Sequence, residues 1–222
     1  TDDNITWTGT FTPSTNIEDT SNILSLANSY TDLAGNAGVT AQTANYSIDT
    51  LAPTAAITYD SSSPYKDADT VVITATFSQA MADSPVPQIV ITGSGIANVA
   101  ATNMTKTSTT VYTFSYNVPT GDGTGTITLA TGTDPSGNLV TATPTSGATF
   151  TVDNTTLTVS QFTLSDSSLL VGETATVTLV FSEQVTLFSS DDITVQNGTL
   201  SAMSTDDNIT WTGTFTPSTN IE

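Results

Sequence analysis

The chain contains no cysteine and no histidine. Without cysteine no disulfide can hold the fold, and without histidine there is no imidazole to act as a general base or as a metal ligand. It also lacks any run of eighteen apolar residues and any signal-peptide pattern, so no membrane span is expected. These absences exclude histidine-dependent catalysis, zinc sites of the usual kind and disulfide-stapled scaffolds.

Basic residues are nearly absent as well. Lys66 and Lys106 face 21 acidic residues, and the net charge is −19. Such a surface repels nucleic acid and anionic lipid and attracts cations. Hydrophobic residues nevertheless make up 36% of the chain, which is enough to bury a core and more than acidic disordered chains usually have. Abundant Thr, Ser, Asn and Gly without Cys is typical of secreted bacterial proteins, so we expect an extracellular or cell-surface location.

Threonine, a β-branched residue that favours strands, makes up about a fifth of the sequence. Several segments alternate between apolar and polar residues, and Gly, Pro, Asn and Asp separate them at intervals of about ten residues. No segment of twelve or more residues has the apolar periodicity of a helix. The predicted fold is therefore an all-β, immunoglobulin-like sandwich. The clearest predicted strands are 5–12, 70–78, 110–118 and 174–182.

The chain begins and ends with the same eighteen residues. TDDNITWTGTFTPSTNIE occupies 1–18 and again 205–222, an offset of 204 residues without a mismatch. Identity of this length does not arise by chance. We therefore interpret the chain as a window, slightly wider than one period, on a longer array that repeats every 204 residues.

A weaker repeat divides this period into two modules of about a hundred residues, the size of an immunoglobulin-like domain. YSIDTLAPT (46–54) parallels FTVDNTTLT (150–158), and TDLAGN (31–36) parallels TDPSGN (133–138). Residues 51–153 form a complete module. Residues 154–222 are the N-terminal part of the next one, and residues 1–50 are the C-terminal part of such a module. Because a whole module separates the two halves, we expect each to complete the half of a neighbouring chain or to belong to a continuous polymer.

Acidic residues recur at matching places, where the chain passes from one module to the next. At the crossing from the central module into the following one, the predicted set is Asp69, Asp153 and Asp32, with Glu183 as a fourth candidate. At the other crossing the predicted set is Glu173, Asp49 and Asp134. Gln79 replaces the glutamate there. Carboxylates gathered with so little Lys or Arg repel one another unless they gain protons or a divalent cation.

Calcium suits such a set because it takes six to eight oxygen ligands in irregular geometry, from carboxylates and carbonyls. Asn36 and Asn138 can add side-chain oxygens, and the glycine before each permits a tight turn. The sequence therefore predicts Ca²⁺ at the crossings, in preference to Mg²⁺. The alternative is that D-x-x-G-N is an ordinary turn motif without metal.

The motifs SIDTLAPT, TDLAGN and TDPSGN, with the strand ends FSE and FSQ, resemble bacterial Ig-like tandem repeats. In particular they resemble the calcium-dependent extender repeats of giant RTX-type adhesins, including those of marine and ice-binding bacteria. The resemblance covers essentially the whole chain. It implies Ig-like sandwiches, calcium at the junctions between modules, and a role as a long stalk.

The leading functional hypothesis is a mechanical one, in which the modules are spacers of an adhesin that supports cell adhesion or biofilm, and junction calcium stiffens the stalk. No residue pattern supports catalysis, so no enzyme activity is expected. The partners expected are neighbouring modules of the same array or of adjacent chains, with glycan or surface contacts made by other domains. Two alternatives are a self-assembling filament or surface layer built from complementary half-modules, and a glycan-binding module.

Overall fold

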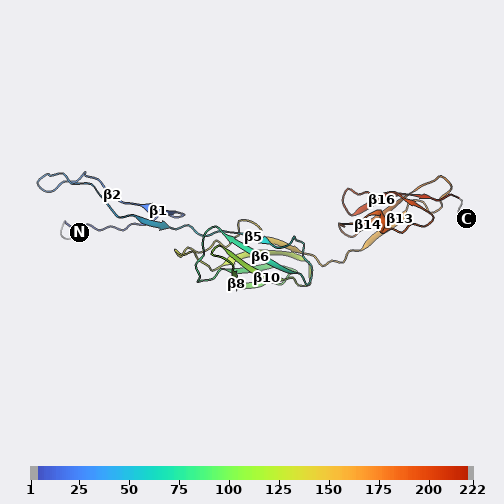
Figure 1. The fold of residues 1–222 in the computed structure, drawn as a ribbon, viewed down its shortest axis with the longest axis horizontal. Helices are drawn as coiled ribbons and strands as arrows, with labels where there is room; N and C mark the ends of the chain where they lie inside the picture. Colours follow the sequence, from blue (N-terminus) through green and yellow to red (C-terminus); the bar gives the residue numbers. More distant parts are fainter. Residues whose placement is uncertain (1–4, 220–222) are drawn as a thin grey trace. The chain divides into compact units, whose positions relative to one another are not determined.

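The computed structural model describes residues 5–219, whose regular secondary structure is almost entirely β-strand (Figure 1). The prediction of an all-β, immunoglobulin-like fold is confirmed. One short 3₁₀ turn, η1 (Ser190–Asp192), interrupts the strands. Within the described residues no helix has the length and hydropathy that a membrane crossing requires. The chain divides into two compact units, of which the first ends at Asn154 and the second begins at Thr155.

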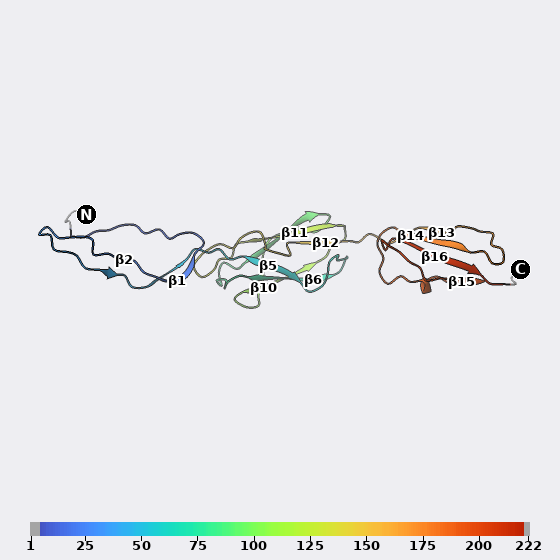
Figure 2. The same cartoon turned by 90° about the horizontal axis from the view of Figure 1, so that it is seen from above.

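The central part of the first unit is a sandwich of two four-stranded antiparallel sheets, which Figure 2 shows as two layers. One sheet has the order β5-β6-β10-β9, with β5 (Ala55–Tyr59), β6 (Thr70–Phe77), β10 (Val111–Asn117) and β9 (Thr105–Lys106). The other has the order β12-β11-β7-β8, with β12 (Thr149–Val152), β11 (Gly123–Ala130), β7 (Gln88–Ser94) and β8 (Val99–Asn103).

The core lies between these sheets and comes from the alternation seen in the sequence. Successive side chains of a strand point to opposite faces, so every second residue of β6 is buried, from Val71 to Phe77. Ile89 and Ile91 of β7 and Ile127 of β11 meet them with no exposed surface. Each such burial contributes about 1.5–3 kcal/mol to folding. This core holds in place the end of the sandwich at which the candidate site lies.

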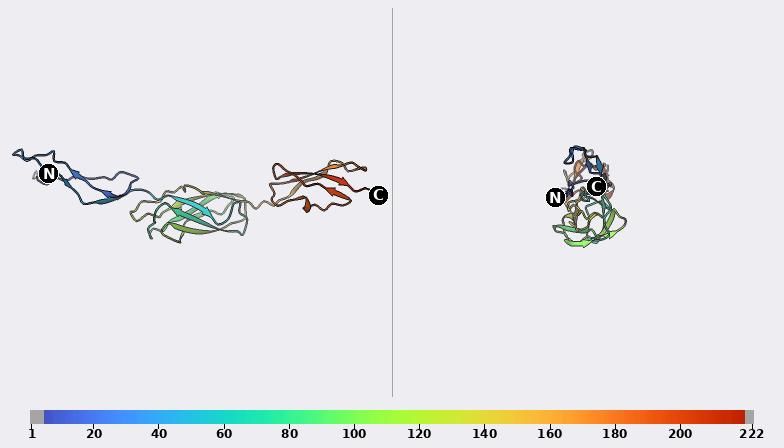
Figure 3. Two further views of the ribbon diagram at one scale, coloured as in Figure 1. Left: turned by 45° about the horizontal axis from the view of Figure 1, so that its top comes forward. Right: turned by 90° about the vertical axis from the view of Figure 1, so that its left-hand side faces the viewer.

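Residues 5–50 form two short antiparallel strand pairs without a second layer of their own (Figure 3). β1 (Glu18–Asn22) pairs with β4 (Tyr46–Asp49), and β2 (Ser25–Leu26) pairs with β3 (Ala41–Gln42). The predicted strand over 5–12 is wrong, because these residues have no strand conformation and Trp7 is 78% exposed.

The same residues do form a strand at the other end of the chain. In the second unit, β16 (Thr210–Pro217) lies between β14 (Ala175–Phe181) and β15 (Gly198–Leu200), and β13 (Val159–Leu164) completes a sheet of order β13-β14-β16-β15. Trp211, the counterpart of Trp7, is half-buried against Phe188, with ring centroids 5.0 Å apart. An identical sequence is therefore a strand between β14 and β15 and irregular near the start of the chain.

Candidate functional site

The loop Asp134–Asn138 follows β11 and is closed by its own backbone. Asp134 N–H donates to Asn138 O at 3.1 Å, and Gly137 N–H donates to Asp134 O at 3.1 Å. Gly137 has φ = +91°, a conformation that residues with a Cβ rarely adopt, which explains the glycine of this motif. The turn aims the Asp134 side chain into the end of the sandwich.

The Asp134 side chain is buried, with 2% of its surface exposed. Its Oδ1 accepts the backbone N–H of Asn138 at 2.9 Å, and its Oδ2 accepts Asn138 Nδ2 at 2.8 Å and Gln79 Nε2 at 2.7 Å. A buried carboxylate is costly unless hydrogen bonds satisfy it, and here neutral amide donors do so. Gln79 also donates to Leu51 O at 2.9 Å, which ties the loop to the start of the sandwich.

Asp49 joins this group from the end of β4. Asn138 Nδ2 lies 3.1 Å from Asp49 Oδ1 and 3.3 Å from Asp49 O, so one amide group bridges the carboxylates of Asp49 and Asp134. The structure thus brings together three of the predicted site residues where the chain enters the central sandwich. The bridging role of Asn138 was not expected, since the sequence suggested it as an oxygen ligand.

The loop Asp32–Asn36 repeats the same hydrogen bonds in the N-terminal segment. Asp32 Oδ1 accepts the N–H of Asn36 at 2.8 Å, and Oδ2 accepts Asn36 Nδ2 at 2.7 Å. Gly35 has φ = +89°, matching Gly137. Asp32 differs from Asp134 in being exposed. The hydrogen bonds from the side chain and then the backbone of Asn36 lower the pKa of Asp32 below its ordinary value of 3.8.

This shift predicts how the Asp32 loop responds to acid. Since the folded-state pKa lies below the unfolded value, the stabilising contribution is present above the unfolded value and is lost as the pH falls through the folded pKa. We expect an NMR titration of the Asp32 carboxyl carbon to give a midpoint below 3.8. Asn36→Ala removes the largest cause and should move the midpoint upward. An unchanged midpoint in that variant would contradict the assignment.

Asp69 and Glu173 occupy equivalent turns in the two units and cap them in the same way. Asp69 Oδ2 accepts Lys66 N–H at 3.0 Å, and Glu173 Oε2 accepts Leu170 N–H at 2.9 Å. Both acids thus have a local structural role that the sequence did not indicate. Each keeps a second carboxylate oxygen outside these bonds.

The remaining predicted residues are Asp153 and Glu183. Asp153 follows β12, and its backbone N–H donates to Tyr65 O at 2.8 Å. Glu183 is half-buried and corresponds in sequence to Gln79. Asp32 belongs to the first unit, whereas Glu173 and Glu183 belong to the second. The predicted grouping of Asp32 with Asp69 and Asp153, and of Glu173 with Asp49 and Asp134, therefore stays a prediction.

The oxygens near Asn138 are of the kind that calcium takes, since they belong to two carboxylates and the Asp49 carbonyl. The Asn138 amide presents its Nδ2 to them as a hydrogen-bond donor and is not a ligand in this arrangement. Within residues 5–219, however, no three carboxylates gather closely enough to form a metal site alone. A third carboxylate at this end would have to come from another module, as the sequence predicts for Glu173. Calcium at this end of the sandwich therefore stays a prediction.

Sequence reasoning missed the role of Asn154, which fastens the end of the central sandwich. Its side-chain Oδ1 accepts Asp67 N–H, its Nδ2 donates to Gly121 O, and its backbone N–H donates to an Asp122 carboxylate oxygen. These bonds hold the residues after β12 beside Asp67 and Asp122. No motif in the sequence signals this arrangement.

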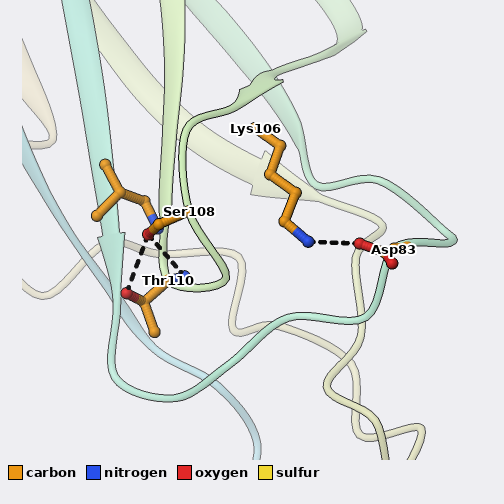
Figure 4. A network of polar contacts seen from close by, with 5 residues as sticks. Asp83, Lys106, Ser108 and Thr110 are labelled. Carbon is orange, nitrogen blue, oxygen red and sulfur yellow. Dashed lines mark hydrogen bonds and ion pairs between the residues drawn. The ribbon is translucent and has the colours of Figure 1, made fainter.

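The lysines do little to compensate the acids of the candidate site. Lys106 Nζ contacts Asp83, an exposed aspartate, beside a turn in which Ser108 accepts the N–H groups of Thr110 and Val111 (Figure 4). Exposed pairs of this kind contribute little to stability, because water screens the two charges. Lys106 is therefore engaged locally, and no lysine lies in an ion pair with Asp49 or Asp134 in the part of the chain that the structure describes.

The chain was compared with known protein families. A family model described as a bacterial Ig-like domain matches residues 1–48 and 152–222, together just over half of the chain. None of the curated proteins compared with the chain matches it. In the sequence, the first matched segment precedes the central sandwich and the second begins in its last strand, β12.

Proposed function

Because the chain belongs to the bacterial Ig-like domain family, we propose that it is an extender segment of an RTX-type adhesin, in which calcium stiffens the junctions between modules. Bacterial Ig-like domains are typically structural, non-enzymatic modules of extracellular or surface proteins. The finer assignment draws support from the meeting of Asp49, Asp134 and Asn138 where the chain enters the central sandwich. It implies a role in cell adhesion or biofilm formation.

Asp49 and Asp134 would hold the ion, with Glu173 of the preceding module as a third carboxylate. A calcium ion supplies two positive charges to a surface that carries −19 per chain and has two lysines. Without it, the carboxylates of adjoining modules repel each other and the junction bends freely. Extracellular calcium modules typically bind at about 10⁻⁴–10⁻³ M, so such sites fill outside the cell and stay empty in the cytosol.

Small-angle X-ray scattering tests this proposal. We expect the maximum dimension to increase when about 10⁻³ M calcium replaces chelator, because neutralised junctions resist bending. Asp153→Ala, at the crossing from the central module into the following one, should reduce the increase in maximum dimension that calcium causes, because it loosens that junction. The hydrogen-exchange protection of the central strands should stay unchanged. Asp191→Ala, in the exposed turn η1, is the matched control and should behave like the parent chain. Identical scattering with calcium and with chelator would refute calcium stiffening.

A further inference from the structure

Among residues 5–219, three asparagines have a left-handed backbone conformation. The φ angle is +59° at Asn16, +55° at Asn197 and +57° at Asn208. Asparagine tolerates this conformation better than most residues with a Cβ, because its short polar side chain can bond locally. The chemical stability of each turn depends on the residue that follows, because the backbone nitrogen of that residue can attack the carbon of the asparagine side-chain amide.

In two of these three turns the backbone nitrogen of the following residue is already engaged. Ile17 N–H donates to Thr50 Oγ1 at 3.0 Å, and Ile209 N–H donates to Asp207 Oδ1 at 2.8 Å. A nitrogen held in a hydrogen bond loses its proton less easily, and the β-branched side chain of isoleucine hinders its approach to the neighbouring amide. Both turns are therefore protected against attack by their own backbone.

The third turn is different, because Asn197 is followed by glycine in the only Asn–Gly pair of the sequence. Asn197 is exposed, and its side chain has no hydrogen-bond partner among the described residues. Gly198 lies opposite Pro217, and Ser218 N–H donates to Asn197 O at 2.8 Å. In an antiparallel pair this arrangement makes Gly198 a non-hydrogen-bonded position, so its N–H points away from β16.

The Gly198 N–H faces the outer edge of its sheet, because β15 is the last strand in the order β13-β14-β16-β15 (Figure 2). The complete central sandwich has an edge of the same kind at β9, the last strand in the order β5-β6-β10-β9. Its turn between β7 and β8, which follows QIVI (88–91) as the Asn–Gly turn follows DITV (192–195), is exposed at Gly95 and Asn98. The exposure of this turn is thus a property of the fold.

The fold also explains why asparagine and glycine stand at these two positions. A Cβ added to Gly198 would overlap the ring of Phe215 and would lie 2.6 Å from Thr216 O, so only glycine fits there without a shift of the backbone. The left-handed conformation at Asn197 favours glycine or asparagine. The start of β15 therefore requires a pair of residues that is chemically reactive.

We propose that Asn197 is a site of spontaneous deamidation in the folded protein. Gly198 N loses its proton to solvent and attacks Asn197 Cγ. A C–N bond forms, and the side-chain nitrogen takes up a proton and leaves as ammonia, so that a cyclic imide remains. Water then opens the ring. Attack of water at the side-chain carbonyl gives aspartate, and attack at the main-chain carbonyl gives isoaspartate, in which the backbone runs through the former side chain.

Both products change the surface of the second unit. Each adds one negative charge to a chain whose net charge is already −19. Isoaspartate also lengthens the backbone by one carbon atom at the start of β15, which moves the carbonyl of Asn197 away from Ser218 N–H. We therefore expect the amide hydrogen of Ser218 to exchange faster in the isoaspartate form, while the amides of the central sandwich keep their protection.

Peptide mass spectrometry of the full chain, incubated in its native state, tests the proposal. A protease that cleaves before aspartate releases residues 192–205 separately from the peptide that contains Asn208. It also cleaves before an aspartate formed at position 197 but not before isoaspartate, which distinguishes the two products. We expect conversion at Asn197, faster at higher pH because Gly198 N must lose its proton. Asn16 and Asn208 should stay intact when half of Asn197 has reacted.

Asn197→Gly is the matched control, because glycine adopts positive φ and has no amide to lose. It should form no isoaspartate and should keep the hydrogen exchange of the fresh parent chain at Ser218. The parent chain in denaturant gives the reactivity of the same sequence without the fold. Conversion at Asn197 in denaturant but not in the native state would overturn the proposal, and so would equal rates at Asn197 and Asn208 in the native chain. Calcium takes no part in the reaction, so neither result bears on calcium stiffening.

Discussion

Replacing Ile91 by alanine is expected to lower the free energy of unfolding of the central sandwich by about 2–5 kcal/mol. Ile91 has no exposed surface and lies opposite Ile127, in the middle of the covered face. Alanine removes three carbon atoms and leaves a cavity that the paired strands cannot collapse to fill. A domain of this size is stable by only about 5–15 kcal/mol, so the loss is a large part of the total.

Hydrogen exchange of the amides of β7 and β11 is the measurement, because it assigns the loss to the central sandwich and not to the other parts of the chain. Leu139→Ala is the matched control. Leu139 is 60% exposed, and the change should alter the free energy by no more than about 0.5 kcal/mol. Equal protection in the two variants would mean that the face between the sheets is not the core.

The alternation of apolar residues was enough to predict the strands of the sandwich and the buried side of β6 and β14. Val71, Ile73 and Ala75 are buried as expected, and so are Ala175 and Val177. Such predictions succeed because a period of two can bury only one set of side chains. Alternation says nothing about whether a neighbour is present to pair with the strand.

The eighteen-residue repeat makes this limit visible. Residues 5–12 and 209–216 have the same sequence, yet only the second copy lies in a sheet, between β14 and β15. A strand gains its hydrogen bonds and its buried face from its neighbours, so local sequence alone cannot decide its structure. The exposed Trp7 and the half-buried Trp211 report this difference directly.

The candidate site was predictable to a similar extent. The repeated D-x-x-G-N motif and the aspartate that ends β4 single out Asp49, Asp134 and Asn138, and the structure brings these three together at one end of the sandwich. Their binding of a metal stays a prediction. The donors were not predictable, because which atom of Asn138 faces a carboxylate depends on the packed loop. Gln79, taken as a lost ligand, is an amide donor that satisfies Asp134. The spacing of residues within one module does not show which acids of a neighbouring module lie close to it.

Replacing Asp134 by alanine is expected to destabilise the entry to the central sandwich by about 2–4 kcal/mol, since a buried donor left without its acceptor costs about 1–3 kcal/mol. The backbone N–H of Asn138 loses its acceptor, and the amides of Asn138 and Gln79 lose a shared one. Leu51 and Asp49 are held through those same amides, so the loss extends to the crossing itself.

Asp32→Ala is the matched control, because it removes the same set of bonds from a loop of the same sequence pattern. Asp32 is exposed, so water replaces its hydrogen bonds and the effect should be clearly smaller. Hydrogen exchange at Asn138 and Leu51 measures the first variant, and exchange at Asn36 measures the second. Equal losses in the two loops would show that burial of the Asp134 carboxylate does not strengthen this end of the sandwich. The larger loss at Asp134 would show that the hydrogen bonds of the protein itself order the carboxylate oxygens at this end of the sandwich.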